Sequence, residues 1–162
     1  MTQPVKTPTA TIETSLGSLT VEFWPDVAPL HVKNFLDLAR SGFYENVIFH
    51  RLIPGFMIQG GDPTGTGTGS NGNVRLKAEF NKRADRKHTR GVLSMARSND
   101  PNSASCQFFI MHQDSPHLDG QYSAFGKVTS GIEVVDKIVA LPKGPGDRPT
   151  NPPKILKITV NE

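Results

Sequence analysis

Cysteine is nearly absent from this sequence, because its 162 residues include only one, Cys106. A single thiol cannot form an internal disulfide, so the fold depends on its hydrophobic core, as is usual in a reducing compartment. Long apolar runs are missing too: no segment approaches the roughly 20 residues that span a bilayer, and residues 1–13 lack the apolar stretch of a secretory signal. We therefore expect a cytoplasmic protein without a membrane segment.

Strong charge of one sign is also lacking, because the formal net charge is only +3. The densest basic run, NKRADRKHTR at 81–90, contains no aromatic side chain on which a base could stack. We interpret this run as a solvated surface loop and expect no nucleic-acid partner.

Motifs that bind metals or cofactors are missing. The histidines, at positions 31, 50, 88, 112 and 117, form neither an HxH nor an HExxH motif, so the sequence predicts no metal site. The glycine-rich segment GTGTGSNG at 65–72 lacks the Lys-Ser or Lys-Thr pair of a P-loop and the spacing of a dinucleotide-binding fingerprint. We expect a mobile loop at this segment and no cofactor.

A covalent nucleophile is not indicated either. Ser115, His117 and Asp119 lie too close together in the chain to reproduce a Ser-His-Asp triad, and there is no GxSxG motif. Cys106 has apolar neighbours, which raise the pKa of a thiol and lower its reactivity. The sequence therefore offers no convincing covalent catalyst.

Short strands separated by turns dominate what is present. The length is that of one domain, and 15 glycines with 13 prolines indicate many turns. Apolar and polar residues alternate on both sides of SLGS in 9–25, which predicts a hairpin. Further strands are predicted in 47–60, where Pro54 and Gly55 separate two of them, and in 91–96, 106–111, 123–128 and 154–162.

Two segments have the period of an amphipathic helix. In 28–42, Val32, Phe35, Leu36 and Ala39 occupy one helical face, and in 130–141 a similar pattern recurs. Many strands with two separate helices favour an antiparallel sheet closed into a barrel, with the helices outside.

The segment FHRLIPGFMIQGGD at 49–62 places an arginine among apolar residues. Alternation in 47–53 predicts that Arg51 shares a face with Phe49 and Ile53. Spacing alone leaves two interpretations open. Arg51 is either a functional cation or an arginine reaching water at a barrel rim, with Phe56, Met57 and Phe109 in the core.

FHRLIPGFMIQGGD, GVLSMA, SCQFFI and LDGQYSAFGKV follow one another in the chain. Together they closely resemble the cyclophilin family of peptidyl-prolyl cis-trans isomerases. The resemblance implies a mainly β fold, a closed eight-stranded antiparallel barrel capped by two α-helices. It also implies a single domain over 1–162, in which we expect residues 1–8 to form a flexible N-terminal extension.

The resemblance assigns roles to individual residues. It places the catalytic arginine at Arg51, and Gln59 either holds the substrate carbonyl or orients Arg51. It places the proline pocket at Phe56, Met57, Phe109 and Leu118. The other substrate-binding positions that it implies are Ala96, Arg97, Gln107, His117 and Tyr122.

Three positions depart from the form usual in animal cytosolic members: Arg97 replaces an asparagine, His117 a tryptophan and Tyr122 a histidine. These changes resemble single-domain bacterial-type members and predict weak cyclosporin binding. The implied activity is isomerisation of X-Pro bonds in proline-containing peptides and in unfolded or folding proteins, by a monomer. A non-catalytic adaptor or chaperone that binds proline-containing segments is the alternative. Retention of Arg51 and of the complete apolar set favours catalysis.

Overall fold

The computed structural model describes residues 8–66, 75–81, 83–98 and 100–161. The expected N-terminal extension, residues 1–8, lies outside these ranges except for Pro8, whose carbonyl accepts a hydrogen bond from the Phe23 N–H (3.0 Å). Of the predicted mobile loop at 65–72, only Gly65 and Thr66 are described.

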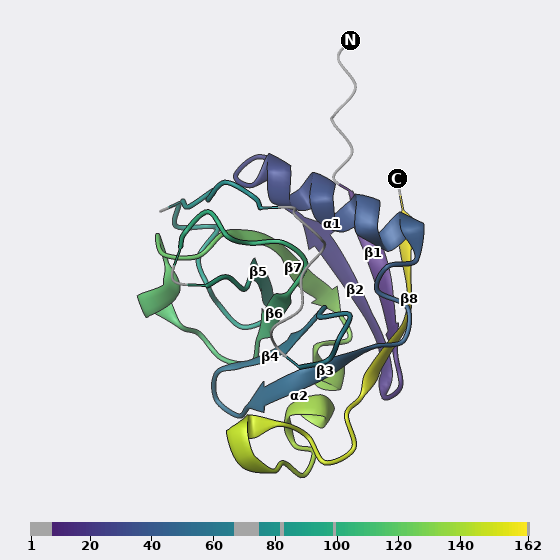
Figure 1. Cartoon of the computed structure of the whole chain (residues 1–162). Coiled ribbons are helices and arrows are strands. Elements are labelled where there is room, and N and C mark those ends of the chain that lie inside the picture. The colour runs from purple at the N-terminus through teal and green to yellow at the C-terminus, as the bar shows by residue number, and fades with distance from the viewer. Residues whose placement is uncertain (1–7, 67–74, 82, 99, 162) are drawn as a thin grey trace.

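Eight strands form a closed antiparallel barrel in the order β1-β2-β7-β5-β6-β4-β3-β8 (Figure 1). The strands are β1 (Thr9–Thr14), β2 (Gly17–Phe23), β3 (Val47–Ile53), β4 (Met57–Gly60), β5 (Val92–Met95), β6 (Phe108–Met111), β7 (Ala124–Ser130) and β8 (Lys154–Asn161). The predicted barrel is confirmed, including the strand number that the family resemblance implied.

Helix α1 (Pro29–Ser41) forms where the apolar period predicted it. Pro29 occupies the first turn, where its missing N–H costs nothing, and Gly42 ends the helix in the left-handed region with φ 81°. The predicted apolar face is buried and packs against β7 and β8. A sequence-distant carboxylate, that of Glu79, accepts hydrogen bonds from the Leu30 and His31 N–H groups at the start of the helix.

Helix α2 (Ile132–Val139) lies on the other side of the barrel from α1 and contacts β2, β3 and β4 (Figure 1). It is shorter than the predicted range because Gly131 adopts a left-handed conformation, with φ 86°, and forces the chain to start the helix after it. Two short 3-10 helices, η1 (Pro116–Leu118) and η2 (Pro145–Asp147), were not predicted.

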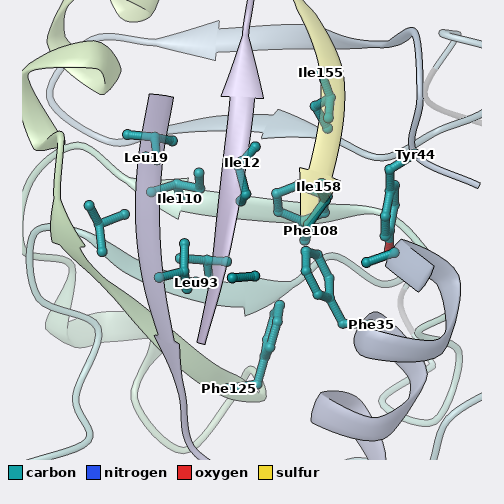
Figure 2. Packing of buried hydrophobic residues seen from close by; sticks show 14 of the residues in the cluster. Ile12, Leu19, Phe35, Tyr44, Leu93, Phe108, Ile110, Phe125, Ile155 and Ile158 are labelled. Carbon is teal, nitrogen blue, oxygen red and sulfur yellow. The ribbon is translucent and has the colours of Figure 1, made fainter. Parts of the chain in front are cut away.

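Aromatic side chains fill the barrel interior together with aliphatic ones from the surrounding strands (Figure 2). The Phe35 ring from α1 meets the Phe108 ring edge-on, with 5.2 Å between centroids, and lies 5.4 Å from the Phe125 ring. Tyr44 is also buried, and its hydroxyl donates to the Cys106 carbonyl (2.8 Å). The interior is therefore closed to ligands, and a binding site has to lie on the outer surface.

A second apolar cluster covers part of the outer barrel surface and includes Met57, Phe109 and Leu118. Their sequence neighbours Ile58 and Phe108 point into the barrel, so β4 and β6 are covered on both faces. Met57 and Phe109 are therefore buried, as the sequence predicted, but in this second cluster rather than in the barrel interior.

A β-bulge in β3 changes the direction of Arg51. Phe49 pairs with Gly60 and Arg51 pairs with Gln59, so β3 contains one extra residue, His50, at this point. Beyond the bulge the alternation is inverted: Phe49 and Leu52 are fully buried and Arg51 is exposed. The prediction that Arg51 shares a face with Phe49 is thus wrong, because an inserted residue reverses every later side chain.

The described residues of the basic run, 81 and 83–90, are exposed or half-buried with one exception, and the arginines are paired with acids. Arg83 bonds to Asp26 (2.7 Å), and Arg86 bonds to the same carboxylate (3.0 Å). His88 is the exception to the predicted exposure, because only 2% of it is accessible. Within the described ranges, the model contains no helix with the length and apolar character needed to cross a membrane.

Candidate active site

A row of cross-strand neighbours on the outer barrel surface forms the base of the site. Arg51 on β3 pairs with Gln59 on β4, Gln59 pairs with Phe109 on β6, and Phe109 pairs with Ser94 on β5. Directly opposed residues lie about 5 Å apart, so this register alone gathers a cation, an amide and an aromatic ring. The bulge at His50 brings Arg51 into this row.

A pocket of about 150 Å³ opens beside Arg51. Met57, Phe109 and Leu118 form its apolar floor and are at most 6% accessible. Its described lining residues are Arg51, Phe56, Met57, Gln59, Ala96, Arg97, Phe109, Leu118 and Tyr122. The pocket is smaller than the roughly 300–1,000 Å³ of drug-sized sites, which suits one small ring. The structure thus gathers most of the predicted site residues, and we call this cavity the apolar pocket.

Arg51 presents its guanidinium at the edge of the apolar pocket. The side chain is exposed, and in the described part of the chain it forms neither a hydrogen bond nor a salt bridge. A guanidinium keeps its charge at any working pH and carries five N–H donors in one plane. These donors are therefore available to a bound molecule.

Gln59 and Gln107 contact each other: the Gln59 amide donates to the Gln107 side-chain oxygen (3.1 Å). Within the described residues, no direct hydrogen bond joins Gln59 to Arg51, so the orienting role suggested for Gln59 is not seen in this conformation. Gln59 lines the same pocket as Arg51. Gln107 is not a lining residue of the pocket, but it is hydrogen-bonded to Gln59, which is one.

Arg97 and Tyr122 form one unit at the opposite wall. The Arg97 guanidinium carbon lies 4.5 Å from the centre of the Tyr122 ring, and its Nη2 donates to the Gln121 carbonyl (2.7 Å). The Tyr122 ring in turn meets Phe109 edge-on at 5.7 Å. Arg97 and Tyr122, two of the three residues that differ from those usual in animal cytosolic cyclophilins, thus stabilise each other by a cation–π contact.

His117 and Ala96 occupy the rim. The exposed His117 ring lies 5.9 Å from the Phe56 ring, outside the apolar floor. The Ala96 N–H already donates to the Gln107 carbonyl (3.0 Å), so a peptide that follows this edge can bond only to the Ala96 carbonyl.

A buried hydrogen-bonded chain behind Phe109 was missed in the sequence. His88 Nδ1 bonds to Asp119 (2.9 Å), His88 Nε2 bonds to the Ser94 hydroxyl (2.8 Å), and the His88 ring lies 6.3 Å from the Phe109 ring in a nearly parallel stack. Burial lowers the pKa of His88, with the Asp119 hydrogen bond opposing this effect. The neutral ring donates to the carboxylate and accepts from Ser94.

This chain contains the residue types of a hydrolase triad, but its geometry excludes that role. Ser94 is bonded to His88 as in a triad, but it is fully buried, so no substrate carbonyl can reach its hydroxyl. The arrangement instead fixes the ring behind Phe109 and so supports the floor of the apolar pocket. No short sequence motif predicts this hydrogen-bonded chain, because His88, Ser94 and Asp119 come from separate segments.

The thiol of Cys106 is fully buried, and burial raises its pKa to about 11. A protonated, inaccessible thiol is a poor nucleophile. In the described ranges, no three histidine, cysteine or acidic side chains are arranged to hold a metal ion.

Comparison with known proteins agrees with the geometry. The family model described as cyclophilin type peptidyl-prolyl cis-trans isomerase/CLD matches residues 9–160. A relative from Emericella nidulans, named peptidyl-prolyl cis-trans isomerase-like 1, is 47% identical over 153 residues, which cover 94% of each chain.

Solved structures give the same result. A cyclophilin type peptidyl-prolyl cis-trans isomerase from Cryptosporidium parvum superposes with a TM-score of 0.90 at 36% identity, covering 97% of this chain and 99% of that one. A second structure of that protein, determined in the presence of the dipeptide Ala-Pro, has a TM-score of 0.88 at 37% identity, covering 95% and 99%. The matched length and the barrel topology agree, and this chain belongs to the cyclophilin-type peptidyl-prolyl cis-trans isomerase family.

Proposed function

We propose that this protein accelerates rotation about X-Pro bonds without covalent chemistry, with Arg51 as the residue that stabilises the twisted amide. The observation that carries the proposal is the Arg51 guanidinium, which has no partner among the described residues and belongs to a residue lining an apolar pocket of one-ring size. The substrates are proline-containing peptides and unfolded or folding proteins.

The chemistry needs a hydrogen-bond donor. Rotation about an X-Pro bond breaks no covalent bond, but it must overcome amide resonance, a barrier of about 18 to 20 kcal/mol. In the twisted transition state the prolyl nitrogen regains its lone pair and accepts a hydrogen bond, which it cannot do in either planar ground state. A donor aimed at this nitrogen therefore binds the transition state selectively.

The apolar pocket supplies the second requirement, which is to hold the prolyl ring while the preceding carbonyl turns. Met57, Phe109 and Leu118 provide the floor, and Gln59 can donate to the moving carbonyl. An acceleration of about ten-thousand-fold corresponds to about 5.5 kcal/mol. A charged donor in a site that excludes water from one side is able to supply a free energy of that size.

The alternative is a module that binds proline-containing segments without turning them over, as an adaptor or chaperone. The apolar pocket alone would serve binding. The unpaired guanidinium favours catalysis, because an exposed cation adds little to holding an uncharged ring but provides the donor that the transition state needs.

The test is an isomerisation assay on an Ala-Pro peptide, run cold so that the spontaneous rate is slow. Wild type should accelerate the exchange without added metal or nucleotide. Arg51→Ala and Arg51→Lys should both lose most of kcat/KM, because an ammonium lacks the planar set of donors. Arg40→Lys, on the surface of α1, is the matched control and should be fully active. A fully active Arg51→Lys enzyme would show that Arg51 is not the donor.

Four further features remain predictions from the sequence: a cytoplasmic location, a monomeric state, a chaperone role and weak cyclosporin binding. The bacterial character suggested by Arg97, His117 and Tyr122 is likewise untested. The cyclosporin prediction follows from the polar His117 ring at the rim and is developed below.

A further inference from the structure

A second cavity, of about 370 Å³, lies on the other side of Arg51 and Gln59 from the apolar pocket. The two cavities share these two side chains. The additional walls come from His50, from Thr66 and from the turn of η2, including Gly146 and Arg148. We call this cavity the cationic pocket.

The charges around the cationic pocket are uneven. Arg51 and Arg148 contribute two guanidinium groups, and none of the described residues lining it is acidic. The carboxylate that interacts with His50 is that of Asp62, which is 1% accessible and accepts hydrogen bonds from the Thr64 and Thr66 N–H groups. That carboxylate is bonded within its own loop, and the exposed Asp147, between Gly146 and Arg148, is not a lining residue. Among the described lining residues the cations are therefore not matched by acids.

Arg148 is held in place rather than free to swing. Its Nη1 donates to the Gly65 carbonyl (2.5 Å), which ties η2 to the loop after β4. A cation fixed in advance loses less conformational entropy when it binds an anion. At the neighbouring Gly146, an added Cβ would meet no atom within 4 Å, so this wall is open.

His50 adds an independent sign of a missing partner. His50 lies in the bulge, lines the cationic pocket and is 6% accessible, and its Nδ1 has no hydrogen-bond partner in the described part of the chain. Buried polar atoms are nearly always bonded, so an unpaired one beside a polar cavity indicates a site that becomes complete with a ligand or ordered water.

We propose that the cationic pocket binds an anionic side chain of the substrate peptide, a carboxylate or a phosphate, on a residue close to the proline. This inference rests on the proposed function, because it takes the prolyl ring to occupy the apolar pocket. An extended chain advances about 3.3 to 3.6 Å per residue, so a residue one or two positions from the proline can reach past the shared Arg51 and Gln59. The pocket thereby selects which X-Pro segments are bound well.

The experiment measures the dissociation constants of paired peptides by calorimetry. Each pair contains one proline and differs only in Glu against Gln, placed at the first or second position before the proline or at the first or second position after it. At one position or more, wild type should bind the Glu peptide about 3- to 10-fold more tightly, and the difference should shrink as salt is raised. A phosphoserine peptide at that position distinguishes the source: tighter binding than Glu assigns a phosphate, and equal or weaker binding assigns a carboxylate.

Arg148→Gln should reduce the Glu-to-Gln ratio to about one, while Arg148→Lys should keep part of it, since the charge remains. Arg40→Gln removes the same charge from α1 and should leave the ratio unchanged. Thermal unfolding of each variant checks that the loss of the Gly65 contact has not unfolded the protein. A ratio of one at all four positions in wild type, or a ratio that survives in Arg148→Gln, would overturn the inference.

The two proposals fail in different ways. Isomerisation of the Gln peptides tests the proposed function, and the Glu-to-Gln ratio of dissociation constants tests the cationic pocket without any turnover. A protein that discriminates Glu from Gln but isomerises neither would retain the pocket and lose the catalytic proposal. Isomerisation without discrimination would do the reverse.

Discussion

At the scale of single residues, the polar groups of this chain fall into two environments. Arg51, Gln59 and Arg148 face open cavities, where their donors can meet a ligand. Cys106 and His88 are buried and committed to the core, where burial changes the pKa of each toward its uncharged form. Reactivity therefore depends on where the backbone places a group rather than on residue type, since a thiol and an imidazole are more reactive in isolation than a guanidinium.

His117 is the residue that we expect to limit cyclosporin binding. Its ring contacts Phe56 at the pocket rim and is exposed. An indole at this position offers a larger apolar face and an N–H donor, so His117→Trp should tighten cyclosporin binding by about 1 to 3 kcal/mol. Titration of cyclosporin against both proteins, with isomerase activity as the readout, measures this change.

His117→Phe is the control that separates apolar area from the indole N–H. Catalysis should persist in both variants, because neither Arg51 nor the apolar floor includes this position. Tight inhibition of the wild type, or no gain with tryptophan, would mean that another residue determines the affinity.

Cys106 should behave as a structural residue. Its thiol is fully buried and its pKa is raised to about 11, so native protein should react with a thiol reagent at pH 8 only when the fold opens. Denatured protein should react at once. Cys106→Ala and Cys106→Ser should both isomerise peptides, and the serine variant should be less stable by about 1 to 2 kcal/mol, because a buried hydroxyl replaces an apolar atom. Inactivity of a folded Cys106→Ala variant would contradict this assignment.

At the scale of elements, short backbone irregularities decide where strands and helices begin. Gly131 separates β7 from α2 with a φ of 86°, and an added Cβ would lie 2.4 Å from the carbonyl oxygen of Ser18 in β2. The close approach means that α2 can pack against the barrel only if residue 131 has no side chain. Glycine is therefore needed at 131 for two reasons, the left-handed conformation and the close contact with Ser18.

Gly131→Ala should reduce the free energy of unfolding by about 2 to 4 kcal/mol, because left-handed strain and a backbone clash add. Gly55→Ala is the matched control: its φ is 80°, but an added Cβ would meet nothing within 4 Å. This control should cost only about 1 kcal/mol, the strain alone. Urea unfolding of both variants measures the difference, and equal losses would show that the contact with Ser18 is easily relieved.

Most elements could be predicted because their signals are local. Val32, Phe35 and Ala39 recur with the period of a helix, and Ile12 and Leu19 alternate around a turn. The bulge at His50 could not be predicted in this way, because one extra residue in a ladder leaves no trace in composition. The bulge becomes visible only when β3 is aligned with its partner β4, and the sequence does not show which strands pair.

The candidate site was predictable only where the motifs of the family carry it. Arg51, Gln59 and Phe109 lie in those motifs, and the structure brings them into one row. Arg148 reaches the site from a turn far along the chain, and His88 from a run that looks solvated. Such residues are joined by the closure of the barrel, which no local pattern encodes.

At the scale of the whole molecule, three histidines are buried, and two of them, His31 and His88, join distant segments. His31 on α1 bonds to Glu79, His88 joins Asp119 to Ser94, and His50 lies in the bulge of β3. Burial lowers the pKa of each below its ordinary value. Carboxylates oppose this shift, those of Glu79, Asp119 and Asp62 respectively, while Arg51 and Arg148 reinforce it at His50 and His117 reinforces it at His88.

These lowered pKa values predict that stability falls as the pH drops below about 6.5, the ordinary histidine pKa. Above that pH the three rings are neutral in both the folded and the unfolded chain and cost nothing. Below it the unfolded chain binds protons that the folded chain does not, so each ring removes up to about 1.4 kcal/mol per pH unit until its folded pKa is reached. Urea unfolding between pH 8 and 5 should show this slope. His117→Gln, at an exposed position, should leave this slope nearly unaltered, because the charge of His117 is the smallest contribution to the pKa of His88. A free energy of unfolding that is flat over this range would show that the buried rings become protonated without cost.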